Sequence, residues 1–147
     1  GLPSEQTVRP VVKELGEASE PVVLDIERWP LKGDVQAVKT SVSKLLAVLS
    51  WIKNEMPRAK IGTYGTVPLP DYWRAIRGPT NAEFQTWQQD NDRLDELLPH
   101  MDAVYPSIYT FYSDRQGWVT YCDCADRGGS PKSHGKAGLC ISVAAVS

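Results

Sequence analysis

Three short apolar segments alternate with two longer segments of helical periodicity, and this order constrains the fold more than any other feature. The apolar segments are rich in β-branched residues and are predicted to be strands at residues 21–27, 59–65 and 102–109. The helical segments span residues 35–55 and about 82–98. Strands that alternate with helices indicate an α/β fold, here a parallel β-α-β-α-β unit with right-handed crossovers.

Local signals mark the expected helix ends. Asp34 is a suitable N-cap for the first long helix, and Pro57 follows its end. Asp71 is expected to cap a short helix that reaches Ile76, and a weaker helical pattern precedes the first strand at residues 8–19. These signals support the same order of elements without relying on hydrophobic periodicity.

The pattern changes after Tyr121. Residues 122–147 contain several glycines and show no helical or strand period before Leu139. We therefore expect one domain over residues 1–121, followed by an irregular or flexible C-terminal tail over residues 122–147. Within that tail, residues 139–146 are apolar enough to add a strand to the edge of the sheet.

Composition and motifs exclude several classes of partner. The chain has 16 basic and 18 acidic residues without a basic cluster, so no nucleic-acid partner is expected. No apolar run approaches the ~20 residues of a membrane span, so no membrane partner is expected. The sequence has no phosphate loop or dinucleotide fingerprint, so we expect no cofactor. The paired C-x-x-C spacing typical of zinc sites is absent from Cys122, Cys124, Cys140 and His134, so we expect no metal.

Asp25 and Glu27 follow the apolar part of the first predicted strand. Side chains two positions apart on a strand point to the same face, and the carboxyl end of a parallel strand opens onto the ligand crevice. Two carboxylates there are what acid/base cleavage of a glycosidic bond requires. The alternative is structural: Glu27 pairs with Arg28 or a nearby lysine, and Asp25 caps a turn.

Tyrosines mark the ends of the other two predicted strands. Tyr64 closes the second strand, and Tyr105 and Tyr109 flank the end of the third. An unbroken strand places Tyr105 and Tyr109 on one face, although Pro106 interrupts that pattern. These phenols either line the same crevice as the two acids or pack in the core with a satisfied hydroxyl.

Four segments carry a more specific pattern: residues 23–30 (VLDIERWP), 61–65 (IGTYG), 91–94 (NDRL) and 103–109 (AVYPSIY). They are similar, in order, to the D-W-E-x-W-R-P, W-G-F-Y-G, N-D-x-L and A-L-Y-P-S-I-Y segments of the hyaluronidase family of glycoside hydrolases. The resemblance covers about residues 20–112. Ile26 stands where the family has Trp, and the Arg that follows the second Trp is missing, so the chain resembles a distant, bacterial-type relative.

This resemblance implies a TIM-type (β/α) barrel that cleaves N-acetylhexosaminide polysaccharides or oligosaccharides internally by substrate-assisted acid/base catalysis. Carried over by position, Glu27 is the general acid/base, and Asp25 orients and stabilises the acetamido group of the substrate. Tyr64 and Tyr109 contact the sugar near the reacting bond, and Trp29 packs the wall of the site. The candidate substrate-binding residues are therefore Tyr64, Tyr109, Tyr105 and Trp29.

The chain is too short for a whole barrel, which takes about 250 residues. Three β-α units form a partial barrel with two open sheet edges, and such edges need cover. We expect closure by self-association into a homodimer or by the C-terminal tail. Three functions stay open: a glycoside hydrolase, a carbohydrate-binding remnant without turnover, and an inactive self-associating half-barrel.

Overall fold

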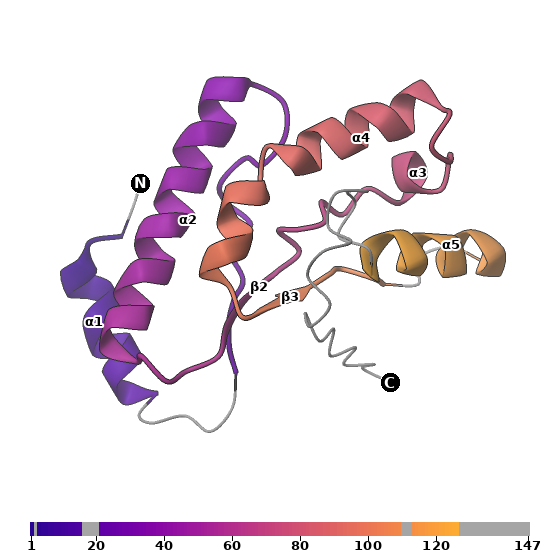
Figure 1. Cartoon of the computed structure of the whole chain (residues 1–147). Coiled ribbons are helices and arrows are strands. Elements are labelled where there is room, and N and C mark those ends of the chain that lie inside the picture. Colours follow the sequence, from indigo (N-terminus) through magenta and orange to yellow (C-terminus); the bar gives the residue numbers. More distant parts are fainter. Residues whose placement is uncertain (2, 16–20, 110–112, 127–147) are drawn as a thin grey trace.

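The computed structural model describes residues 1, 3–15, 21–109 and 113–126 (Figure 1). Within these ranges, no helix is long and apolar enough to cross a membrane. The elements in chain order are α1 (Glu5–Glu14), β1 (Val22–Leu24), α2 (Val35–Glu55), β2 (Ile61–Tyr64), α3 (Tyr72–Ala75), α4 (Ala82–Asp92), the 3-10 helix η1 (Asp95–His100), β3 (Ala103–Tyr105) and α5 (Arg115–Asp126).

The three strands form one parallel sheet with β2 at its centre. Val23 pairs with Gly62 across the first ladder, and Thr63 pairs with Val104 across the second. Helix α2 lies in the first crossover, while α3, α4 and η1 lie in the second. The predicted mixed α/β class, with parallel strands connected by helices, is therefore confirmed.

The predicted strands were too long at their carboxyl ends. Strand β1 ends at Leu24, so Asp25 and Glu27 lie just beyond the strand and not within it. Strand β3 ends at Tyr105 because the next residue, Pro106, has no N–H to donate to the ladder. The side chains expected at the crevice therefore lie on the segments that leave the sheet.

The single helix predicted over residues 82–98 was also wrong. Helix α4 ends at Asp92, and the chain tightens into η1. The Leu94 N–H bonds to the Asn91 carbonyl at 2.8 Å, and the Leu97 N–H bonds to the Leu94 carbonyl at 2.9 Å. Since a 3-10 helix has three residues per turn, Leu94 and Leu97 share one side and are both fully buried.

The predicted helix caps are confirmed. Asp34 begins α2 by accepting a hydrogen bond from the Ala37 N–H at 2.8 Å, which satisfies one of the unpaired donors of the first turn. Asp71 begins α3 in the same way, with the Arg74 N–H at 3.3 Å. Both caps stand beside segments that line the pocket described below.

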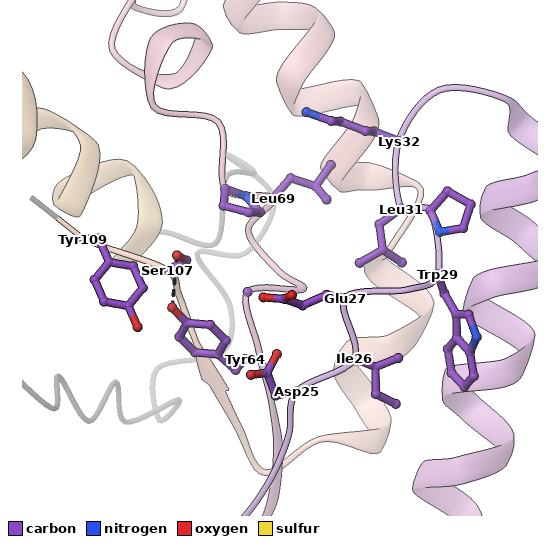
Figure 2. Close-up of a pocket in the computed structure, with 13 residues that line it drawn as sticks. Asp25, Ile26, Glu27, Trp29, Leu31, Lys32, Tyr64, Leu69, Ser107 and Tyr109 are labelled. Atoms are coloured by element: carbon purple, nitrogen blue, oxygen red, sulfur yellow. Dashed lines mark hydrogen bonds between the residues drawn. The ribbon is translucent and has the colours of Figure 1, made fainter. Parts of the chain in front are cut away.

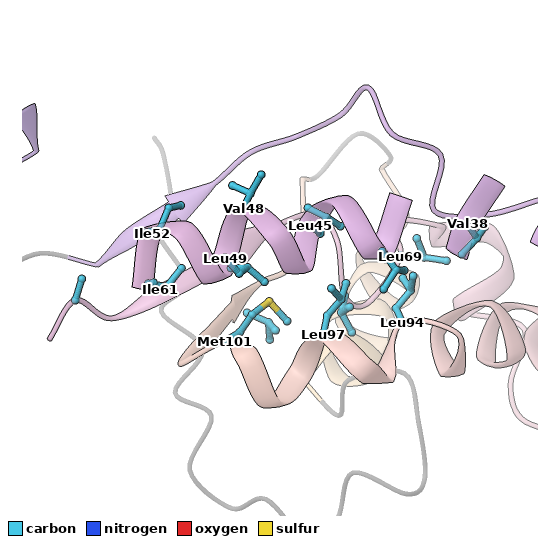
Figure 3. Close-up of a cluster of buried hydrophobic side chains, with 14 of the residues drawn as sticks. Val38, Leu45, Val48, Leu49, Ile52, Ile61, Leu69, Leu94, Leu97 and Met101 are labelled. Carbon is cyan, nitrogen blue, oxygen red and sulfur yellow. The ribbon is translucent and has the colours of Figure 1, made fainter. Parts of the chain in front are cut away.

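The core lies between α2 and one face of the sheet (Figure 3). Leu45 and Leu49 of α2 are almost fully buried and face Ile61 of β2, together with Leu97 and Met101 on the segment that enters β3. Full burial of one such side chain stabilises the fold by about 1.5–3 kcal/mol. This packing fixes the sheet against α2 and so fixes the position of the strand ends.

The other face of the sheet is more open. Val23 is 43% exposed on this face. The ring of Tyr105 lies over Gly62 there, because a Cβ added to Gly62 would stand 2.6 Å from the Tyr105 ring edge and from the Ala103 carbonyl oxygen. Glycine at position 62 therefore leaves the space that the Tyr105 ring occupies.

The amino end of the sheet is held by Asp102. Its carboxylate accepts the Ile61 N–H at 3.0 Å and lies 3.2 Å from the Lys60 ammonium and 3.3 Å from that of Lys53. Burial alone would raise the pKa of the Asp102 carboxyl, but these donors outweigh it and hold the pKa below its usual value. The bonds connect α2, β2 and the start of β3 at one point.

Helix α5 spans Arg115–Asp126 and so crosses residue 121, where the domain boundary was expected. Trp118 and Tyr121 on this helix contact the segment that follows β3, as their hydrogen bonds show. The rest of the expected tail, including the possible strand at residues 139–146, lies outside the described residues, as does the end of the segment 8–19.

Candidate functional site

A pocket of about 670 Å³ lies at the carboxyl ends of the strands (Figure 2). One wall is the segment that follows β1, from Asp25 to Lys32. Tyr64 and Gly65 at the end of β2 form the floor, and Ser107 and Tyr109 beyond β3 form the opposite side. Ligand crevices of parallel α/β sheets form at this end of the strands.

Asp25 and Glu27 both line the pocket, and both side chains are exposed to solvent. Figure 2 shows them on the same side of the segment as Tyr64, while the side chain of Ile26, which also borders the pocket, points in another direction. Ile26 is partly buried and packs against the core. The alternation predicted for a strand thus continues for three residues after the ladder ends, which brings the two carboxylates together.

Tyr64 lies at the centre of the pocket. Its hydroxyl donates to the Ser107 hydroxyl oxygen at 3.1 Å. Burial of the phenol is the largest influence on the pKa of Tyr64 and raises it; Ser107 acts in the opposite direction, while the neighbouring Tyr109 hydroxyl and Asp25 carboxylate raise it further. The net pKa is above the usual value, so Tyr64 is a neutral phenol that can donate a hydrogen bond at neutral pH.

The other two tyrosines are in different surroundings. Tyr109 lines the pocket and is 59% exposed, at the outer side of the cluster formed by Tyr64 and Ser107. Tyr105 is not among the lining residues, because its ring lies over Gly62 on the sheet. Since β3 ends before Pro106, the spacing of four residues does not bring Tyr105 and Tyr109 to one site.

Trp29 contributes mainly to the wall. It lines the pocket and is partly buried against the core, and the Lys44 ammonium of α2 lies 5.7 Å from its ring centroid. This distance is within the range of a cation–π contact. The ring is therefore held toward α2.

Sequence reasoning did not single out the polar lining residues Ser107 and Lys32. Ser107 lies between Tyr105 and Tyr109, within the segment 103–109 that resembles the family strand, but no local pattern indicated its hydrogen-bond partner. The Lys32 ammonium is 3.6 Å from the Asp71 carboxylate, which also pairs with Arg74 at 2.8 Å. Lys32 places one positive charge in a pocket that holds two carboxylates.

The pocket loop at Leu69 is fixed by buried polar side chains of α4. The Asn91 amide oxygen accepts the Leu69 N–H at 2.7 Å, and the Trp87 indole N–H donates to the Leu69 carbonyl at 3.0 Å. The Asn91 amide nitrogen also donates to the Trp87 carbonyl at 2.8 Å. Both backbone groups of Leu69 are thus satisfied, as burial requires.

These side chains give the pocket proton-transfer and hydrogen-bonding groups. Among the residues that the structure describes, no group of three or more His, Cys, Asp or Glu side chains is close enough to hold a metal ion. Two carboxylates and a neutral phenol can exchange protons with a bound ligand and orient its polar groups. Chemistry built from these residues is acid/base chemistry.

No protein-family model, curated protein or solved structure matches this chain. The resemblance of its four motifs to the hyaluronidase family therefore stays a prediction.

Proposed function

We propose that the chain is a glycoside hydrolase unit that acts on N-acetylhexosaminide polysaccharides or oligosaccharides. The observation that carries this proposal is the position of Asp25, Glu27 and Tyr64 in one pocket, at the carboxyl edge of a parallel sheet. We further propose that the three strands are part of a TIM-type barrel, in which this edge is where the active site forms. The motif order supports both proposals.

In the proposed reaction, protonated Glu27 gives its proton to the glycosidic oxygen. At the same time, the acetamido carbonyl oxygen of the substrate bonds to the anomeric carbon, and the bond to the leaving sugar breaks. Water then attacks the anomeric carbon, the Glu27 carboxylate takes the proton of that water, and the acetamido group re-forms. This is the substrate-assisted exception to the scheme with two catalytic carboxylates.

The remaining pocket residues position the substrate. Asp25 accepts a hydrogen bond from the acetamido N–H group. Its charge balances the positive charge that develops as the acetamido oxygen attacks the anomeric carbon. The Tyr64 oxygen accepts a hydrogen bond from a hydroxyl group of the reacting sugar, since its own hydrogen is donated to Ser107. Tyr109 extends the contact toward solvent.

Turnover tests this assignment: the wild-type chain is expected to release new reducing ends from N-acetylhexosamine oligomers, and a variant without the Glu27 acid is not.

A second candidate is carbohydrate binding without turnover. The exposure of Tyr109 favours it, because the pocket is open on that side and the described residues that line it follow three strands. Barrel enzymes collect catalytic groups from several strands around the mouth. Calorimetric binding of the oligomers, with no change in their length after long incubation, supports this candidate over hydrolysis.

We also propose that two copies of the chain associate through the open face of the sheet at Val23. Parallel sheets are almost always covered on both faces, and Val23 is 43% exposed. Light scattering on a sizing column is expected to give twice 16.3 kDa. A Val23→Lys variant is expected to shift the mass toward one chain. A wild-type mass of one chain at all concentrations contradicts this proposal.

A further inference from the structure

Helix α5 holds the segment that follows β3 through two hydrogen bonds to its backbone. The Tyr121 hydroxyl donates to the Ser107 carbonyl at 2.9 Å, and the Trp118 indole N–H donates to the Ile108 carbonyl at 3.0 Å. Tyr121 is 3% exposed, so its bond is shielded from water. Two successive peptide carbonyls are therefore fixed at the point where the chain turns past the pocket.

The side chain of Ser107 points the other way, into the pocket (Figure 2). Its hydroxyl oxygen receives the Tyr64 hydroxyl hydrogen at 3.1 Å. The backbone strengthens this link, since the Gly65 N–H donates to the Tyr105 carbonyl at 2.8 Å one residue beyond the last ladder pair. Tyr64 is thus joined to the β3 side of the pocket through both main chain and side chain.

Rotation about the Cα–Cβ bond of Tyr64 would carry its hydroxyl through an arc in the pocket. An acceptor fixed at the end of this side chain favours one orientation, and Ser107 accepts the Tyr64 hydroxyl hydrogen at 3.1 Å. Tyr109 and the Asp25 carboxylate border the same hydroxyl. The orientation set by Ser107 keeps the Tyr64 phenol between Asp25 and the exposed side of the pocket at Tyr109.

We propose that Ser107 is a positioning residue, which holds the Tyr64 hydroxyl in the orientation that meets the sugar, with α5 fixing Ser107 in turn. The expected effect on kcat rests on the proposed function, but the orienting hydrogen bond between Ser107 and Tyr64 does not depend on turnover. The positioning of Ser107 gives α5 a role in the pocket, although this helix follows the residues, about 20–112, that resemble the family.

Kinetics of three variants test the proposal. Ser107→Ala is expected to lower kcat about tenfold, with KM changed less than about twofold, because an orienting bond acts mainly on the reacting complex. Ser107→Thr keeps the hydroxyl and restores most of kcat. The matched control is Ser43→Ala on α2, whose hydroxyl donates to the Lys39 carbonyl at 3.0 Å, and it is expected to behave as wild type.

A spectroscopic readout separates this proposal from the proposed function. Ultraviolet titration of wild type minus Tyr64→Phe isolates the Tyr64 phenolate. Ser107 lowers the pKa of Tyr64, so Ser107→Ala is expected to raise it, and Ser107→Thr to leave it near the wild-type value. The carboxylate that faces the phenol, Asp25, is present in all variants.

The outcomes are distinct. A Tyr64 pKa that does not respond to Ser107→Ala overturns the positioning role, as does a loss of kcat that Ser107→Thr fails to restore. If the wild-type chain has no turnover, the proposed function fails and the titration alone decides this inference. A raised Tyr64 pKa in Ser107→Ala, with normal circular dichroism, supports it in either case.

Discussion

The Glu27→Gln variant is expected to lose turnover of N-acetylated oligomers by roughly 100- to 10,000-fold. Glutamine has the size and hydrogen-bonding reach of glutamic acid, but its amide cannot give a proton to the glycosidic oxygen. The side chain of Glu27 is exposed in the pocket, so the fold does not depend on its charge. Release of reducing ends over time measures the loss, with circular dichroism as the check on folding.

The matched control for this change is Glu96→Gln on η1. Glu96 is exposed and does not line the pocket, so the same chemical change there is expected to leave turnover unaltered. Equal activity of Glu27→Gln and wild type contradicts the role given to Glu27. Binding of the oligomer is expected to survive in Glu27→Gln, because the other contacts of the pocket remain.

The Asn91→Ala variant is expected to lose about 3 kcal/mol of unfolding free energy, because two buried backbone groups lose a hydrogen bond to its side chain, and a buried donor left unsatisfied costs about 1–3 kcal/mol. The groups are the Leu69 N–H and the Trp87 carbonyl, and Asn91 itself is 1% exposed. A small cavity adds to the loss. Urea unfolding followed by tryptophan fluorescence measures this change.

Gln89→Ala is the control on the same helix, since Gln89 is exposed on α4. It is expected to change the unfolding free energy by less than about 0.5 kcal/mol. Because Leu69 lines the pocket, Asn91→Ala is also expected to weaken oligomer binding at temperatures where the chain is still folded. A stability equal to that of Gln89→Ala contradicts the role of the Leu69 hydrogen bonds.

The sequence was sufficient for the order of the three strands and the long helix between the first two, for two helix caps, and for the side on which Asp25 and Glu27 lie. Asp34 and Asp71 stand directly before apolar periodic segments, so their capping role could be predicted from local chemistry alone. The shared direction of Asp25 and Glu27 follows from backbone geometry, which does not need a full ladder to persist. Local rules were enough wherever the partners lie within a few residues.

Contacts between distant segments could not be predicted in this way. The break after Asp92 depends on the core, which takes up both Leu94 and Leu97 once the chain tightens. The position of Tyr105 depends on the space above Gly62, a residue of the neighbouring strand. Ser107 gained its partner from β2, a contact that no motif spacing indicates. Tertiary context decided each of these outcomes.

The most direct test of the central claim compares two substrates with the wild-type chain: an oligomer of N-acetylhexosamine, and the same oligomer after removal of its acetyl groups. Our account predicts new reducing ends from the acetylated oligomer only, because the acetamido oxygen is the nucleophile in the proposed reaction. Cleavage of both oligomers at similar rates, or of neither, contradicts it.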